Sequence, residues 1–432
     1  MSVINDHISV PWWDIQPLWG VVQRVKEVGA PEAQPLSVFL DDGVIPRSYR
    51  GDNHNRLGDN LSAYLIVRPG DLVFNKLRTW QGGLGVSGHH GIVSPAYFVC
   101  RPTSKTFPRY LHYLLRSNVY LAELTRISKW MPPSQFDIPW EQLKNLPIIV
   151  PPIEEQRRIA DFLDAEVMRI VRLTDARRSQ LQAFEERELS LISERFIPGS
   201  VNRASGEFPW PWLPRISECA PLVRLGYLCQ VQGGVTVDAS RDPSDADVTR
   251  PYLRVANVKA GRLELDSVNE ITVPKTVADR STLQPGDVLM TEGGDIDKLG
   301  RGTVWSGELP GALHQNHVFA LRPDPERLDA EYLALLTRSL HGRCYFEATG
   351  VKSTNLASTS SSKVKSFPIP FVSLEEQRKA VSEVNGSLVE VDILRASLTR
   401  QIDLLEERKR ALITAAVTGQ IDVTTARGAD LS

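Results

Sequence analysis

The side chains in this sequence that could do chemistry gather in short basic, amide and hydroxyl clusters, separated by glycines. Guanidinium, ammonium and amide groups of this kind hydrogen-bond to the phosphates and base edges of nucleic acid. In the N-terminal half, three clusters (47–56, 75–81 and 129–135) supply the candidates Arg50, Asn53, Asn55, Arg56, Lys76, Arg78, Trp80, Gln81, Lys129, Ser134 and Gln135. In the C-terminal half, clusters at 254–259, 298–301 and 352–355 supply Arg254, Asn257, Lys259, Lys298, Arg301, Lys352, Ser353, Thr354 and Asn355. Any single member could instead be a solvated loop residue.

Motifs for catalysis or cofactor binding are missing from the sequence. Transfer of a methyl group to a base amino group needs an Asn or Asp, two prolines and an aromatic residue, and the nearest match, 131–134, is Met-Pro-Pro-Ser. The run Gly-Gly-Leu-Gly at 82–85 fits a β-turn better than a cofactor loop. A phosphate-binding Gly-x-x-x-x-Gly-Lys-Ser/Thr loop is absent as well. We therefore expect no catalytic centre and no bound cofactor.

Two histidine pairs suggest a metal site only superficially. His314-x-x-His317 and His341-x-x-Cys344 lack the tight Cys-x₂₋₄-Cys spacing of strong zinc motifs. The two pairs also fall on different predicted elements. We expect no metal ion.

The elements that must position the polar clusters come from an internal duplication. LPIIVPPIEEQRRI at 146–159 returns as FPIPFVSLEEQRKA at 367–380, an offset of 221 residues (375 − 154). Phe98 and Phe319 keep this offset, whereas the Pro-Gly-Asp triplets at 69–71 and 285–287 are 216 residues apart. Small insertions therefore fall in the front of each copy, and the back has a constant length. Such a repeat predicts two similar structural units.

Each copy has a variable front and a long helical back. The front alternates short apolar runs with glycine- and asparagine-rich turns, which is typical of strands, and then predicts a helix near 108–127 or 329–341. The second long helix opens with the capping box Ser373-x-x-Glu376. Apolar residues then recur in steps of three and four over 381–412, and the first helix repeats this pattern over 163–191. Such a stripe needs a helical partner, so we predict antiparallel pairing of the two helices. The alternative is that each helix packs on its own front or on another protein.

The overall composition narrows the class of protein only slightly. The 432 residues carry a formal net charge of −2, less basic than many nucleic-acid-binding domains, although basic loops and acidic helices can coexist. No apolar run reaches the roughly 20 residues of a membrane-spanning helix, and the first residues lack a signal-peptide pattern. The four scattered cysteines form no Cys-x-x-Cys pair. We therefore expect reduced thiols and a cytoplasmic protein.

The duplicated architecture resembles one protein family. LPIIVPPIEEQRRIADFL (146–163), FPIPFVSLEEQRKAVSEV (367–384) and AVTGQID (416–422) are similar to segments of the specificity subunits of type I restriction-modification systems. The resemblance covers essentially the whole chain, with Ser373 standing where the first copy has Pro152. It implies an α+β fold in which two α/β target-recognition domains (1–153 and 200–372) are each followed by a long spacer helix (154–199 and 373–432, the latter with a C-terminal tail). The two helices would form an antiparallel coiled coil.

The resemblance also implies partners. In such proteins each recognition domain reads one half of a split DNA site, and the helices dock two DNA methyltransferase subunits. Double-stranded DNA and two methyltransferase subunits are the implied partners, with ATP-dependent motor-nuclease subunits as an optional addition and S-adenosylmethionine on the methyltransferase. Apolar residues expected on the outer helix faces, and so candidates for docking that partner, are Leu173, Ile192, Leu394 and Ile413. Two rival functions stay open: a stand-alone DNA methyltransferase or endonuclease, and a coiled-coil scaffold without a nucleic-acid role.

Overall fold

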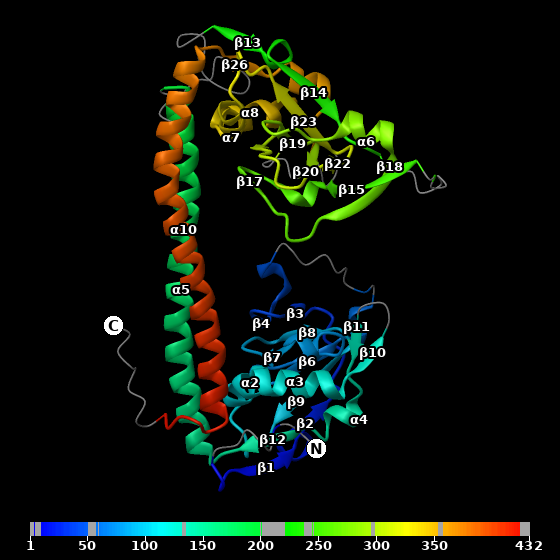
Figure 1. Cartoon of the computed structure of the whole chain (residues 1–432). Helices are drawn as coiled ribbons and strands as arrows, with labels where there is room; N and C mark the ends of the chain where they lie inside the picture. Colours follow the sequence, from blue (N-terminus) through cyan, green and yellow to red (C-terminus); the bar gives the residue numbers. More distant parts are fainter. Residues whose placement is uncertain are drawn as a thin grey trace. The chain divides into compact units, whose positions relative to one another are not determined.

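The structure, a computed structural model, describes residues 4, 10–50, 58, 60–131, 135–198, 200, 221–236, 244, 246–294, 299–352 and 357–423. Its internal contacts divide the chain into two units. The first unit comprises Met1–Arg178 with Arg400–Ser432, and the second comprises Ser179–Thr399. Each unit therefore combines a sheet-containing domain with part of both long helices (Figure 1).

The first unit is built on a four-stranded antiparallel sheet in the order β2-β9-β6-β7. In the central strand β6, Leu72, Val73 and Phe74 are all fully buried, as a short continuous apolar run predicts. Four smaller pairs, β1–β12, β3–β4, β5–β8 and β10–β11, complete the domain. The strands are β1 (Asp14–Pro17), β2 (Val22–Val25), β3 (Leu36–Phe39), β4 (Gly43–Pro46), β5 (Leu65–Val67), β6 (Leu72–Asn75), β7 (Leu84–Val86), β8 (Gly91–Val93), β9 (Tyr97–Pro102), β10 (Lys129–Met131), β11 (Gln135–Asp137) and β12 (Pro147–Val150).

Helices cover this sheet and share its core. The segment predicted as one helix near 108–127 is two helices, α2 (Pro108–Arg116) and α3 (Asn118–Ile127). The break falls at Ser117, whose ψ of 153° is extended and whose hydroxyl donates to Leu114 O at 2.8 Å. The short helices are α1 (Leu18–Val21), α4 (Trp140–Leu143) and the 3₁₀ turns η2 (Arg47–Tyr49), η3 (Leu61–Ala63) and η4 (Thr79–Gln81).

The second unit repeats this plan with the sheet β14-β23-β19-β21. Its helices α7 (Ala330–Arg338) and α8 (Leu340–Thr349) are separated at Ser339, so the helix predicted near 329–341 was drawn too short. A sheet β18-β15-β22, a sheet β20-β25-β24 and the pairs β13–β26 and β16–β17 accompany it. The remaining elements are β13 (Leu222–Arg224), η6 (Leu225–Tyr227), β14 (Cys229–Gly233), β15 (Asp247–Leu253), η7 (Val255–Asn257), β16 (Val258–Lys259), β17 (Arg262–Leu263), β18 (Asn269–Pro274), α6 (Lys275–Ser281), β19 (Val288–Thr291), β20 (Gly293–Gly294), β21 (Gly302–Val304), β22 (Leu313–His314), β23 (Val318–Pro323), β24 (Val351–Lys352), β25 (Ala357–Ser358), α9 (Ser361–Lys365) and β26 (Pro368–Pro370).

An ion pair with a buried carboxylate explains why the Pro-Gly-Asp triplets recur. The same pair explains the recurrence of the Arg-Pro sequence, which stands at 101–102 and again at 322–323. Asp71 accepts a hydrogen bond from Arg101 Nε at 3.0 Å, and Asp287 accepts one from Arg322 Nε at 2.7 Å. The glycine before each aspartate has a φ of +92° or +91°, a region that glycine enters without strain. Both turns therefore place a carboxylate under the neighbouring strand, where the guanidinium neutralises it.

The long helices α5 (Ile153–Phe196) and α10 (Leu374–Val417) are antiparallel neighbours within each unit (Figure 1). In the first unit, Leu163 of α5 and Val417 of α10 belong to one core cluster. Arg178 and Glu406 form an ion pair across the same two helices at 3.6 Å. The start of α5 thus lies beside the end of α10, which confirms antiparallel pairing in this unit.

The second unit shows the opposite ends of the same helices. Phe196 of α5 shares a core cluster with Ala380 of α10, and Arg195 forms an ion pair with Glu383 at 2.5 Å. The predicted stripe is buried: relative exposure is 8% or less for Val384, Leu388, Val391 and Leu398. Helices that packed only on their own fronts would leave this stripe uncovered, so that alternative is wrong. None of the helices that the structure describes is long and apolar enough to span a membrane.

The Glu-Glu-Gln-Arg motif fastens each long helix to its domain through the glutamine. Gln156 is fully buried. Its carbonyl accepts from Phe107 N at 2.8 Å, and its amide donates to Lys105 O at 3.0 Å and Pro151 O at 2.8 Å. One side chain therefore satisfies three backbone groups at the junction of α2 and α5.

Gln377 makes the same three contacts in the second unit. Its carbonyl accepts from Asp329 N at 2.9 Å, and its amide donates to Arg327 O at 3.0 Å and Val372 O at 2.9 Å. The adjoining capping box is also formed, as its sequence predicted. The most recognisable motif of the chain thus fixes the position of a helix.

Candidate nucleic-acid interface

In the first unit the structure brings two of the predicted polar clusters together. The segment after β6 carries the cluster 75–81, and the hairpin β10–β11 carries part of the cluster 129–135. The backbone links them, because Ile138 N donates to Lys76 O at 3.2 Å. The rings of Trp80 and Phe136 also pack, with centroids 4.9 Å apart. These clusters therefore form one continuous surface at the end of the central strand.

The remaining cluster of this unit, 47–56, comes close to this surface near Tyr97. Burial raises the pKa of the Tyr97 phenol, and the positive charges of Arg78 and Arg47 counter part of that rise. Asn75 Nδ2 lies 3.5 Å from the same phenol oxygen. Arginines from two segments distant in sequence thus both lie near enough to Tyr97 for their charges to act on its phenol.

The predicted contacts of the first unit differ in how freely they could reach a ligand. Arg78, Gln81 and Lys129 are exposed. Lys76 lies over the Phe98 ring, 4.7 Å from its centroid. Arg50, by contrast, binds Asp42 at 2.9 Å and covers a phenylalanine ring of β3.

Trp80 is a supporting residue in this surface. Its indole N–H donates to Leu77 O at 3.2 Å, and its ring packs on Phe136. The indole N–H of Trp80 is therefore already engaged within the fold, and the DNA contact predicted for this residue stays a prediction. The neighbouring Trp130, which the sequence prediction did not select, is 55% exposed.

In the second unit the hairpin β24–β25 occupies the place of β10–β11. Lys352 on β24 is exposed, and β25 pairs further with β20, which directly follows Glu292. Glu292 Oε2 accepts a hydrogen bond from His317 Nδ1 at 2.8 Å on the same edge. Relative to the Pro-Gly-Asp turns, Glu292 is the counterpart of Lys76 (292 − 76 = 216). The two units therefore present opposite charges at an equivalent position.

One candidate in the second unit was predicted wrongly. Asn257 is buried, with 3% exposure. Its side-chain carbonyl accepts from Arg254 N at 2.9 Å, and its amide donates to Glu264 O at 2.8 Å and Ser267 O at 3.0 Å. The side chain thus binds backbone groups of Arg254, Glu264 and Ser267 and lies away from solvent, so in this fold it has no free donor with which to reach a base.

The other candidates in the second unit remain at or near the surface. Lys259 is exposed and lies 3.6 Å from Glu264, whereas Arg254 and Arg301 are half-buried. Several predicted contacts, namely Asn53, Asn55, Arg56, Ser134, Lys298, Ser353, Thr354 and Asn355, lie outside the described residues, as does the side chain of Gln135. These positions stay predictions.

The four residues predicted to dock a partner divide into two classes. Leu173 and Leu394 are 38% and 48% exposed, as expected for an outer helix face. Ile192 is only 1% exposed because the end of α5 packs into the second unit's core, and Ile413 packs against the first unit's core. Docking through Ile192 is therefore ruled out in this conformation, and Ile413 is partly covered.

The long helices carry further exposed apolar residues, among them Val171, Ile393 and Leu404, and two of the others are related by the duplication. Met168 and Val389 are 54% and 58% exposed, and they are separated by the duplication offset of 221 (389 − 168), as are Leu173 and Leu394. The sequence signal that could have found them is their position outside the three-and-four stripe. We call Met168 with Leu173 the first apolar patch, and Val389 with Leu394 the second.

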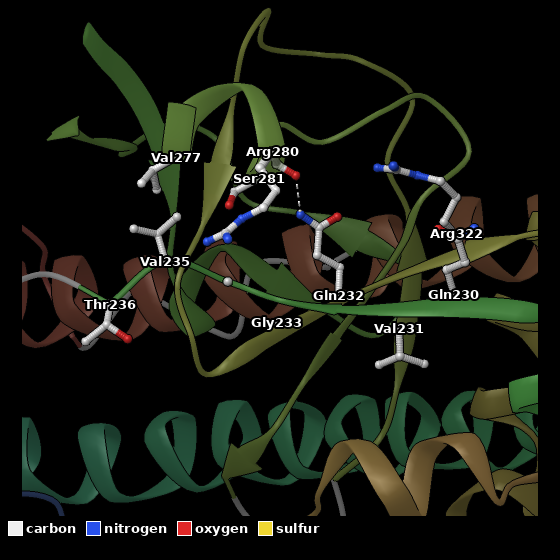
Figure 2. Close-up of a pocket in the computed structure, with 11 residues that line it drawn as sticks. Gln230, Val231, Gln232, Gly233, Val235, Thr236, Val277, Arg280, Ser281 and Arg322 are labelled. Atoms are coloured by element: carbon white, nitrogen blue, oxygen red, sulfur yellow. Dashed lines mark hydrogen bonds between the residues drawn. The ribbon is translucent and has the colours of Figure 1, made fainter. Parts of the chain in front are cut away.

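The second unit also contains an open cavity of about 650 Å³ beside β14 and α6 (Figure 2). Gln232 crosses it and donates to Arg280 O at 2.7 Å. Arg322 also lines the cavity, with its guanidinium held by Asp287. No His, Cys, Asp or Glu is among the described residues that line it. The lining chemistry suits polar contacts, and no sequence pattern indicates this cavity.

Two of the three histidines in the suspected metal pairs, His314 and His341, are buried and bind backbone carbonyls. His314 Nδ1 is 2.7 Å from Val318 O, and His341 Nε2 is 2.7 Å from Pro368 O. Burial lowers the pKa of His341 to about 4. Within the described part of the chain, no group of three or more His, Cys, Asp and Glu residues is arranged to hold a metal ion.

Fold and surfaces together define a class: a duplicated recognition protein, in which each of two α/β domains carries a polar surface and shares an antiparallel helix pair. Comparison with known proteins shows which proteins of this class the chain resembles. The family described as "Type I restriction modification DNA specificity domain" matches residues 105–183. The EcoKI type I restriction enzyme specificity subunit of Escherichia coli K12 is 22% identical over 439 residues, covering 95% of this chain and 89% of that protein.

Two further comparisons agree with this. The putative MjaX type I restriction enzyme specificity subunit of Methanocaldococcus jannaschii is 21% identical over 214 residues, 49% of this chain and 47% of that protein. A chain solved in a study of complex assembly in a type I restriction-modification system shares the fold, with a TM-score of 0.66, 18% identity, and coverage of 95% of this chain and 99% of that one. This chain is thus similar to type I restriction-modification specificity subunits over most of its length, as its sequence implied.

Proposed function

We propose that this chain is the non-catalytic subunit that gives a type I restriction-modification enzyme its DNA sequence specificity, with one half of a split site read by each unit. Similarity to type I restriction enzyme specificity subunits along most of the chain supports the general role. The observation that carries the division of labour is the repeated surface. In each unit, the segment after the central strand and the hairpin after the second helix lie together, and both carry polar or cationic side chains.

The two half-sites are expected to differ in sequence. Lys76 of the first unit corresponds to Glu292 of the second. A lysine donates to guanine O6 and N7, whereas a glutamate accepts from the cytosine amino group. Equivalent scaffold positions therefore offer opposite hydrogen-bonding chemistry to the DNA.

We also propose that the two apolar patches each dock one DNA methyltransferase subunit. The patches are exposed, lie on α5 and α10 outside the seam, and are related by the duplication offset. Two equivalent surfaces fit two copies of one partner. S-adenosylmethionine would then be bound by the methyltransferase, with ATP-dependent motor-nuclease subunits as an optional addition to the complex.

The test is methylation by the complex in cells that carry either the wild-type chain or a paired variant. Arg78→Ala with Gln81→Ala should relax one half-site and leave the other unchanged, since each lost bidentate base contact costs about 1–3 kcal/mol of discrimination. Glu292→Ala with Lys352→Ala should relax the other half. Genome-wide mapping of methylated bases measures both.

Lys105→Ala is the matched control, because it removes an exposed cation of the first unit away from the candidate surface. It should leave the methylated sequence intact. Equal relaxation of both half-sites by either paired variant would show that the units do not read independently. Methylation by the purified chain without any partner would overturn its assignment as a non-catalytic subunit.

A further inference from the structure

Three aromatic rings form a row at the edge of the first unit's candidate surface. Trp80 packs on Phe136 with ring centroids 4.9 Å apart, and Phe136 packs on Trp130 with centroids 5.0 Å apart. The outermost ring, Trp130 on β10, is 55% exposed. The two inner rings therefore support an indole that faces solvent.

The fold of the hairpin does not need this row. Trp130 and Phe136 are cross-strand partners, and the corresponding pair in the second unit is Lys352 and Ala357. The second hairpin forms the same pairing without aromatic residues. The exposed indole of the first unit is therefore not required to hold the hairpin together, and what singles it out is its support by two rings and its cationic surroundings.

The surroundings of Trp130 indicate an anionic ligand. Lys129 is next to it on β10, and Lys76 and Arg78 lie on the segment joined to this hairpin through the Ile138 backbone. Asp137, the cross-strand neighbour of Lys129, is the one acidic residue of the described hairpin. An apolar ring among several cations fits a surface that contacts the phosphates and the grooves of DNA.

An intact duplex offers such a ring very few apolar partners. In the major groove, the base edges carry hydrogen-bond donors and acceptors, and the apolar group among them is the 5-methyl of thymine. A rigidly supported indole at a reading surface can therefore recognise an A·T pair without a hydrogen bond. We propose, on the basis of the DNA-reading function above, that Trp130 is a specificity-determining residue which packs against a thymine methyl in the half-site of the first unit.

The experiment uses the complex of the full chain with its methyltransferase partner. Methylated bases in the host give the recognised sequence, and the Arg78/Gln81 variant shows which half belongs to the first unit. Binding is then measured on duplexes in which each thymine of that half is replaced in turn by deoxyuridine, which removes only the methyl group. One replacement should weaken wild-type binding about fourfold, the value of one buried methyl-sized group.

Variants separate the indole contact from a general loss of structure. Trp130→Ala should weaken binding to the thymine duplex and lose the penalty for deoxyuridine, whereas Trp130→Phe should keep part of both. Trp19→Ala removes another exposed tryptophan of the first unit, 60% exposed on α1, and should change neither. Fluorescence of 2-aminopurine placed in the same half-site should stay low on binding, because the bases remain stacked.

Several outcomes would contradict the proposed contact between Trp130 and a thymine methyl. One is that the half-site read by the first unit contains no A·T pair. Another is that replacing thymine by deoxyuridine weakens binding equally in the wild-type protein and in Trp130→Ala. A rise in 2-aminopurine fluorescence that needs Trp130 would mean that the indole enters the base stack instead. A wild-type complex that binds DNA without sequence preference would refute the proposed function itself, whereas specific binding without any deoxyuridine effect refutes the methyl contact alone.

Discussion

The buried glutamine of each Glu-Glu-Gln-Arg motif offers a sharp test of how the helices are held. Gln377→Leu keeps the side-chain volume similar but leaves Asp329 N–H and the carbonyls of Arg327 and Val372 without their partner. An unsatisfied buried polar group costs about 1–3 kcal/mol. Because water can reach some of these three groups once the amide is gone, the second unit should lose about 2–5 kcal/mol of stability in total. Hydrogen exchange, followed by mass spectrometry, should show faster exchange in α7, β26 and the start of α10.

Two companion variants make the reasoning refutable. Gln156→Leu should produce the same loss in the first unit, around α2 and the start of α5, and leave α7 protected. Gln377→Glu places a carboxylate against two carbonyl oxygens, which raises the pKa of the new carboxyl in the folded state. Its stability should therefore recover as the pH falls and the carboxyl becomes protonated. Uniform loosening of both units by Gln377→Leu, or no loosening at all, would mean that the glutamine does not fasten the helix to its domain.

Two further predictions concern the helix pair. Burial tends to raise the pKa of Glu188, but the hydrogen bonds and charges of Arg395 and Arg338 outweigh it and hold that pKa below its usual value. The stabilisation by this carboxylate is thus present above the ordinary carboxyl pKa and is lost as the pH falls through the lowered pKa. Glu188→Gln should therefore cost about 1.5–3 kcal/mol of stability at neutral pH, and it should flatten the loss of exchange protection in α7 at acidic pH. Parallel pH curves for the wild-type protein and the variant would refute this. In native mass spectra, the number of bound methyltransferase subunits should fall from two to one in the double variant Val389→Glu with Leu394→Glu. The double variant Met168→Glu with Leu173→Glu should have the same effect. Loss of both subunits from either double variant would contradict two separate patches.

The duplication, the central strands and the helix pair could be predicted from sequence because each leaves a local, periodic trace. The run Leu72–Phe74 indicates a buried strand by itself, and the stripe from Val384 to Leu398 indicates a paired helix by itself. The breaks at Ser117 and Ser339 leave no such trace. A single serine is tolerated within a helix, and whether it ends one depends on the tertiary packing around it.

The candidate surface was harder to predict, because side-chain type does not reveal whether its hydrogen bonds are already used. Asn257 has the chemistry of an adenine-reading residue and uses it to cap its own turn. Ile192 has the outward register of a docking residue, but the core of the second unit covers it. Of the two indoles in the predicted clusters, the sequence analysis selected Trp80 and left out Trp130, because residue type does not show which ring is exposed; the structure shows that Trp130 is exposed and supported by Phe136.

The two copies agree where polar groups are buried and differ where side chains face solvent. Both keep the Asp–Arg pair beneath the central strands and the glutamine at the head of the long helix, since losing one partner would leave a buried charge or backbone group unsatisfied. At the surface, the lysine after β6 becomes a glutamate after β19, and the Trp130–Phe136 pair becomes Lys352 and Ala357. Exposed positions of this kind change stability little when they are substituted. The same scaffold can therefore carry two different half-site specificities, and altering one of them should not require any change in how either unit folds.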